Sequence, residues 1–127
     1  MIQLHHTEGA PRAIGPYSQS VSADGLLFTS GQVALDPATG ELVGGGFEAE
    51  ARQVFGNLGA VLASAGCGFA DVLRATVYLA DMGDFPVLNT IYAESFGEHR
   101  PARSTVQVAA LPRGARVEID LVARLPR

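Results

Sequence analysis

The stretch that decides the fold is PARSTVQVAALPRGARVEIDLVA, from Pro101 to Ala123. Residues 103–108 and 116–123 each alternate polar and apolar side chains with the period of two that is typical of a β-strand. Between them, Pro112 and Gly114 are residues that favour a turn. The stretch therefore predicts two neighbouring antiparallel strands joined by a short connection.

The polar side chains select one register for this predicted hairpin. Pairing Thr105 with Glu118 places the polar residues of both strands on one face, whereas a slip of one residue would mix polar and apolar residues on both faces. In this register Arg103 and Glu118 are diagonal neighbours with Cβ atoms about 7–8 Å apart, so both could reach one small molecule. The pattern alone favours a surface ladder of ion pairs, since such pairs are common and contribute at most about 1 kcal/mol.

The rest of the chain predicts an α+β arrangement around this hairpin. An Asp-Gly pair at 24–25 joins two short runs and is a strong hairpin signal. Apolar residues recur with a period of 3.6 over residues 47–65, which predicts a helix, and alternation predicts a strand over residues 72–79. A second helix is expected between Asp84 as its N-cap and Gly97. The expected order is hairpin, strand, helix, strand, helix, strand, strand.

Composition limits the class of protein. The 127 residues are enough for a single domain, 1–127, and 47% hydrophobic with 17% charged residues is a globular composition. The net charge is −4 and the nine basic residues form no run, so nucleic acid is not an expected partner. No apolar run approaches the ~20 residues of a membrane span, and the first residues lack the pattern of a signal peptide. These features predict a cytoplasmic protein that does not bind membranes.

The residue types also limit the chemistry. All nine basic residues are arginine, so a Schiff base on lysine is excluded. The single cysteine, Cys67, permits no intrachain disulfide, and we interpret it as an incidental thiol. The three histidines lack the spacing of metal ligands, so neither a metal nor another cofactor is expected. We interpret Glu48 and Glu50 as a solvated first helical turn rather than a catalytic pair.

Several short motifs follow one another along the chain. They are AIGPYSQ (13–19), TSGQ (29–32), DPATGE (36–41), ARQVFGNL (51–58), VYLADMGDF (77–85), PARS (101–104) and VEI (117–119). In this order and spacing, over nearly the full length, the sequence resembles the RidA/YjgF family of enamine and imine deaminases. The resemblance implies a chorismate-mutase-like α+β fold, with a mixed sheet backed by two helices. It also implies a barrel-like homotrimer with clefts between neighbouring subunits, whose interface is expected to use Tyr78, Val33 and Leu35.

The resemblance further implies a reaction and a site. Family members hydrolyse reactive 2-enamino and 2-imino acids to 2-oxo acids and ammonia. Arg103 matches the family's carboxylate-binding arginine, and Glu118 matches the glutamate expected to orient water and transfer protons. Tyr17 matches a tyrosine of the cleft. The other positions that the resemblance implies for substrate binding are Gly31, Thr105, Ser30 and Asn89.

Two positions depart from the pattern of the family. Thr105 stands where many bacterial members carry a cysteine, so regulation through a thiol is not expected at this position. Arg100 precedes the PAR motif, where relatives often have an aromatic residue, so the family pattern does not define the shape of the cleft at that edge.

Three functions remain open from the sequence. The first is a deaminase of 2-imino acids, and the second is a non-catalytic protein that binds or senses 2-oxo acids in the same cleft. The third is a role in translation or nucleic-acid binding, which the acidic net charge disfavours. Glu118 favours the first over the second, because a carrier of anions has little use for an acid beside its carboxylate site.

Overall fold

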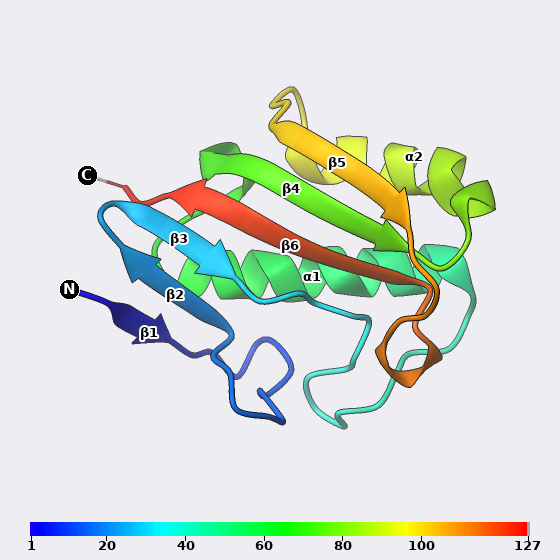
Figure 1. Ribbon diagram of the computed structural model, residues 1–127, viewed down its shortest axis with the longest axis horizontal. Coiled ribbons are helices and arrows are strands. Elements are labelled where there is room, and N and C mark those ends of the chain that lie inside the picture. The colour runs from blue at the N-terminus through cyan, green and yellow to red at the C-terminus, as the bar shows by residue number, and fades with distance from the viewer. Residues whose placement is uncertain (127) are drawn as a thin grey trace.

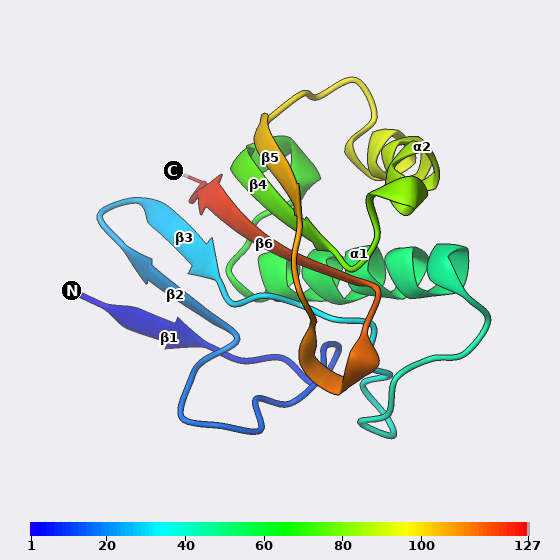
Figure 2. The ribbon, with the colours of Figure 1, turned by 45° about the vertical axis from the view of Figure 1, so that its right-hand side comes forward.

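The computed structural model describes residues 1–126, in which six strands form one mixed sheet in the order β1-β2-β3-β6-β4-β5. The strands are β1 (Gln3–His5), β2 (Ser20–Ala23), β3 (Leu26–Thr29), β4 (Val72–Leu79), β5 (Ala102–Gln107) and β6 (Val117–Arg124). Helices α1 (Phe47–Ser64) and α2 (Phe85–Phe96) cover one face of the sheet (Figure 1). The rotated view shows that no helix of the described residues covers the opposite face (Figure 2).

The helices and β4 follow the predicted patterns to within one residue. Gly66 and Gly97 follow α1 and α2 with φ angles of 77° and 63°, which glycine adopts without steric cost. The apolar faces of both helices pack on the sheet and form the core. Its fully buried side chains include Leu27, Val54, Leu58, Leu62, Val77, Leu79, Leu88, Val117 and Ile119. No helix within residues 1–126 has both the length and the apolar character needed to cross a membrane.

The N-terminal part confirms one prediction and corrects another. β2 and β3 form the predicted antiparallel hairpin, and the residues of its Asp-Gly turn at 24–25 have φ angles of 54° and 81°. β1, which is too short to show periodicity, adds a further strand beside β2. The strand expected between this hairpin and α1 is reduced to two isolated bridges, Gln32 with Ile119 and Leu35 with Leu42.

The structure contradicts the predicted pairing of the two C-terminal strands. β4 lies between β5 and β6, parallel to β5 and antiparallel to β6. Ala75 of β4 pairs with Arg103 on one side and with Leu121 on the other, whereas Tyr78 pairs with Glu118. Paired residues share a face and successive residues alternate. Arg103 therefore lies on the helix-covered face and Glu118 on the uncovered face, and the predicted diagonal contact between them is wrong.

The connection between β5 and β6 explains this difference. Residues 108–116 pass over the end of β4: the Val108 N–H donates to the carbonyl of Leu79 at 2.9 Å, and the Ala80 N–H donates to the carbonyl of Arg116 at 3.1 Å. Alternation along each strand reports which residues share a face within that strand. It carries no information about a third strand that inserts between the two.

Glu50 also differs from its predicted environment. Its side chain is 4% exposed, whereas the sequence predicts a solvated first turn. Its Oε1 atom accepts a hydrogen bond of 2.9 Å from the backbone N–H of Arg116, and its Oε2 atom lies 3.5 Å from Nε of Arg116. The carboxylate thus fastens the start of β6 to the first turn of α1. Glu48, by contrast, is exposed and pairs with Arg52.

We expect Glu50→Ala to lower the free energy of unfolding by about 1–3 kcal/mol, because it removes a buried carboxylate that accepts a hydrogen bond from the Arg116 N–H. Chemical denaturation of both variants and of the wild type measures the difference. The matched control is Glu48→Ala, which should change stability by no more than about 0.5 kcal/mol. Equal effects of the two substitutions would contradict the structural role of Glu50.

Candidate active site

Six of the seven predicted site residues line two separate cavities. The first, the glutamate pocket, has a volume of about 350 Å³ and is lined by Ile14, Tyr17, Ser30, Gly31, Val33, Leu35, Pro112, Arg113 and Glu118. The second, the arginine pocket, has a volume of about 390 Å³ and is lined by Asn89, Tyr92, Ala93, Arg100, Pro101 and Arg103. Within residues 1–126, one chain therefore does not bring Arg103 and Glu118 into the same cavity.

Gly31 and Glu118 are in direct contact in the glutamate pocket. A β-carbon at position 31 would lie 1.9 Å from Oε2 of Glu118, a distance that no real contact permits. The next residue, Gln32, exchanges backbone hydrogen bonds of 2.9 and 3.1 Å with Ile119, which hold this segment against β6. Only a residue without a side chain allows the backbone to approach the Glu118 carboxyl group this closely.

Glu118 has an altered acidity. Burial raises the pKa of its carboxyl group, and the negative charge of Asp120 raises it further. Asp120 itself accepts a hydrogen bond of 3.1 Å from the hydroxyl of Tyr78 on the same face of the sheet. Because its pKa is raised, Glu118 keeps its proton to a higher pH than an ordinary glutamate, which suits a group that both accepts and donates protons.

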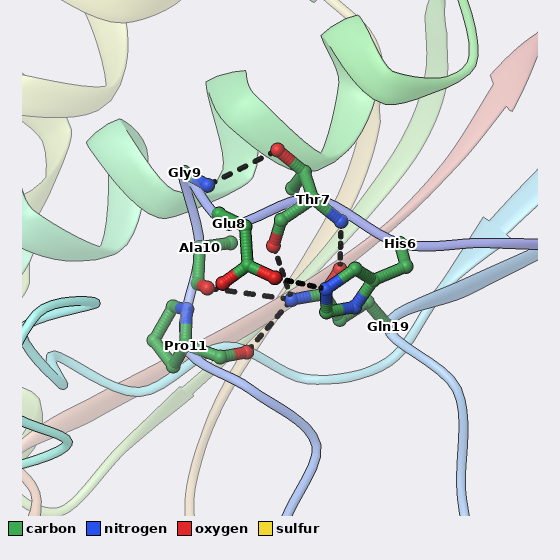
Figure 3. Close-up of polar contacts among 7 residues, drawn as sticks. All are labelled: His6, Thr7, Glu8, Gly9, Ala10, Pro11 and Gln19. Carbon is green, nitrogen blue, oxygen red and sulfur yellow. Dashed lines mark hydrogen bonds and ion pairs between the residues drawn. The ribbon is translucent and has the colours of Figure 1, made fainter.

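A buried amide fixes the loop that carries Tyr17. Gln19 is 2% exposed, and its Nε2 donates to the carbonyls of Thr7, Ala10 and Pro11 while its Oε1 accepts from the Thr7 N–H (Figure 3). These bonds tie residues 7–11 to the segment that enters β2. Gln19 was not among the predicted site residues, because a single buried glutamine gives no periodic signal. Its place in the motif AIGPYSQ is the only feature of the sequence that indicates it.

Ser30 lines the glutamate pocket, but its hydroxyl is already hydrogen-bonded to the protein backbone. Its hydroxyl donates a hydrogen bond of 2.6 Å to the carbonyl of Ser18, and the Ser30 N–H donates to the carbonyl of Gln19 at 2.9 Å. Ser30 therefore joins the start of the segment that contains Gly31 to the loop that carries Tyr17.

Helix α2 holds the guanidinium group of Arg103 in the arginine pocket. Its Nη1 donates a hydrogen bond of 2.8 Å to Oδ1 of Asn89. Its central carbon lies 4.7 Å from the ring centroid of Tyr92 and 5.3 Å from that of Phe85. Such contacts between a cation and aromatic rings restrict the guanidinium. Arg103 has five N–H donors, and Asn89 is its only hydrogen-bond partner within the described residues, so donors remain for an anionic ligand.

Thr105 does not belong to either cavity lining. Thr105 lies on the helix-covered face, as does Arg103, which precedes it by two residues in β5. The hydroxyl of Thr105 is buried and has no hydrogen-bond partner in the described part of the chain. Of the predicted site residues, the structure thus groups Tyr17, Ser30 and Gly31 with Glu118, groups Asn89 with Arg103, and leaves Thr105 apart. Within residues 1–126, no cluster of three or more histidine, cysteine, aspartate or glutamate side chains could hold a metal ion.

Comparison with known proteins identifies the family. The family model described as endoribonuclease L-PSP matches residues 7–125. A mouse protein named 2-iminobutanoate/2-iminopropanoate deaminase is 55% identical over 117 residues, which cover 92% of this chain and 87% of the mouse protein. A RutC family protein from Synechocystis is 51% identical over 127 residues and 98% of each chain. The crystal structure of E. coli TdcF with bound serine has a TM-score of 0.92 at 38% identity, covering 98% of this chain and 99% of TdcF.

The chain therefore belongs to the endoribonuclease L-PSP family, which is the RidA/YjgF family that its motifs indicate. The expected α+β fold, a mixed sheet with α1 and α2 on one face, is confirmed. Several mammalian relatives carry the name of an imine deaminase, and others carry only a family name.

We expect Gly31→Ala to displace the carboxyl group of Glu118 and to lower the free energy of unfolding by about 1 kcal/mol, since the new methyl group overlaps the flexible end of a partly buried side chain. Thermal unfolding followed by circular dichroism measures the effect. Gly56→Ala is the control, because a β-carbon there would meet no atom within 4 Å and alanine favours the helix. If Gly31→Ala is as stable as Gly56→Ala, the tight contact with Glu118 is wrong.

Proposed function

We propose that the protein is an enamine/imine deaminase, a hydrolase that converts 2-imino and 2-enamino acids, of the 2-iminobutanoate and 2-iminopropanoate type, to 2-oxo acids and ammonia. In this proposal the glutamate pocket of one subunit meets the arginine pocket of the next in a homotrimer. The observation that carries the proposal is the placement of Arg103 and Glu118 on opposite faces of one chain. The family's arginine and glutamate can then act on one substrate only where two copies meet.

The uncovered face of the sheet supports such an assembly. Phe28 and Val106 are 48% and 43% exposed. Their strand partners Val122 and Tyr78 place both of them on the face that carries Glu118. A sheet face with exposed apolar side chains indicates contact with another protein surface, and closed symmetric assembly of identical chains is the usual solution. The trimeric state itself comes from the resemblance to the family. The expectation that Val33 and Leu35, which line the glutamate pocket, lie at the interface comes from the partly polar second face of the sheet.

Arg103 is suited to bind the carboxylate of the substrate. A 2-imino acid carries this carboxylate directly beside the carbon of its C=N bond. The guanidinium group can bind it through two parallel charge-assisted hydrogen bonds. Because Asn89 and the ring of Tyr92 already restrain the guanidinium, little side-chain freedom is lost on binding. The imine carbon is then held at a fixed distance from α2.

Glu118 is suited to transfer the protons of the hydrolysis. Starting from the protonated imine, the oxygen of water bonds to C2 while the carboxylate of Glu118 accepts one proton from that water, which leaves a carbon with a hydroxyl and an amino group. Glu118 then returns the proton to the amino nitrogen, and the C–N bond breaks with its electron pair leaving on ammonia. The hydroxyl proton passes to Glu118 as the C=O bond forms, and its loss to ammonia restores the carboxylate.

The remaining predicted residues have supporting roles in this proposal. The ring of Tyr17 packs against the substrate side chain and its hydroxyl is available for a hydrogen bond. The backbone at Gly31 approaches the ligand beside Glu118, and the unpartnered hydroxyl of Thr105 is available when a second subunit closes the cleft. The serine named in the TdcF structure is an amino acid, with nitrogen and carboxylate on the same carbon as in a 2-imino acid.

The test is a coupled assay. An amino-acid oxidase generates the imine, semicarbazide traps it, and the protein should lower the rate of trapping by hydrolysing the imine first. Arg103→Ala should lose nearly all of the acceleration, and Glu118→Gln should lose about 100-fold or more, as expected for a general acid–base group. Arg124→Gln, on the exposed end of β6, is the control and should match the wild type. A protein that binds 2-oxo acids without accelerating imine decay would be a carrier instead, and this outcome would contradict the proposal.

A further inference from the structure

The arginine pocket contains more positive charge than one carboxylate requires. Both Arg100 and Arg103 line it, and within the described residues its lining contains no acidic side chain. Its volume of about 390 Å³ lies within the range of small-molecule sites. A pocket with two guanidinium groups and no acid attracts anions, and favours a ligand with two negative groups over a ligand with one.

Arg100 is anchored in a way that leaves donors free. Its Nη1 donates to the carbonyl of His99 at 3.0 Å and also to the carbonyl of Gly97, just beyond the end of α2. Among residues 1–126, no partner is found for its Nη2 and Nε atoms. One nitrogen thus fixes the side chain to the backbone, while the remaining donors of the fork stay available to a ligand.

Tyr92 lines the same pocket as the two arginines, and the guanidinium of Arg103 lies over its ring. Its side chain is 7% exposed, and its hydroxyl is buried without a hydrogen-bond partner among the described residues. Burial raises the pKa of this phenol, while the positive charges of Arg103 and Arg100 act in the opposite direction. The positive charges of both arginines therefore act on the unpartnered hydroxyl of Tyr92. A buried hydroxyl without a partner indicates a site where a polar ligand supplies the missing hydrogen bond.

We propose that this pocket selects 2-imino acids whose side chain carries a second carboxylate, such as the imines of aspartate-like or glutamate-like amino acids, with Arg100 binding the second carboxylate while Arg103 binds the first. The proposal rests on the deaminase function proposed above and adds a preferred side chain to the 2-imino acids named there. Arg100 is thereby a residue that determines specificity. An imino acid with an apolar side chain would use Arg103 and leave Arg100 in solvent.

The size of the effect follows from the exposure of Arg100. A charge-assisted hydrogen bond is strong in a buried site, but an exposed guanidinium is screened by water and salt. We therefore expect a preference of about tenfold in kcat/KM for the dicarboxylic imine at low ionic strength, decreasing as salt is added.

The experiment compares two imines in the trapping assay, one generated from alanine and one from aspartate by the corresponding oxidases. Arg100→Gln should lower kcat/KM for the aspartate-derived imine about tenfold and leave that for the alanine-derived imine unchanged. Arg100→Lys, which keeps the charge, should retain most of the preference, and Arg124→Gln should retain all of it. The ratio between substrates corrects for any loss of folded protein caused by removing the contacts of Arg100 with the end of α2.

Each outcome decides the proposal. A fall in the ratio for Arg100→Gln but not for Arg100→Lys supports it. An unchanged ratio in Arg100→Gln would mean that Arg100 only stabilises the end of α2, and this result would overturn the inference while leaving the deaminase function intact. If the wild type accelerates neither imine, the deaminase function itself fails.

Discussion

The position of β4 between β5 and β6 is the constraint on which the rest of the structure depends. β4 pairs on both sides, and its register places Arg103 and Glu118 on opposite faces of the sheet. Side chains on opposite faces of a packed sheet cannot be brought together by rotamer changes, because the backbone and its hydrogen bonds lie between them. Any chemistry that uses both groups on one substrate therefore needs a second chain.

The two faces provide different environments for the two groups. On the covered face, α2 supplies an amide and aromatic rings that restrain the guanidinium of Arg103. On the uncovered face, burial and the neighbouring Asp120 raise the pKa of Glu118, and Gly31 leaves room for its carboxyl group. The anion-binding half of the proposed site thus depends on packing between helix and sheet. The proton-transferring half depends on the loops beside β6.

Sequence patterns predicted the elements better than their pairing. Periodicity located α1, β4 and α2 to within a residue, and the Asp-Gly pair at 24–25 located the β2–β3 hairpin. The pairing of β5 with β6 could not be predicted correctly, because alternation is a property of each strand and the insertion of β4 is a property of the whole sheet. Glu50 and Gln19 illustrate a second limit. Their burial depends on backbone groups distant in sequence, Arg116 and residues 7–11, which no local pattern reports.

The central claim is that each site takes its arginine from one subunit and its glutamate from the next. The most direct measurement co-expresses Arg103→Ala and Glu118→Gln subunits with different tags, purifies the mixed assemblies, and compares their imine hydrolysis with that of each variant alone. In every mixed trimer, whether it holds one or two copies of either variant, one interface in three combines an intact Arg103 with an intact Glu118. We therefore expect the purified mixed trimers to recover about a third of the wild-type activity. Mixed assemblies that are no more active than the separate variants would contradict it.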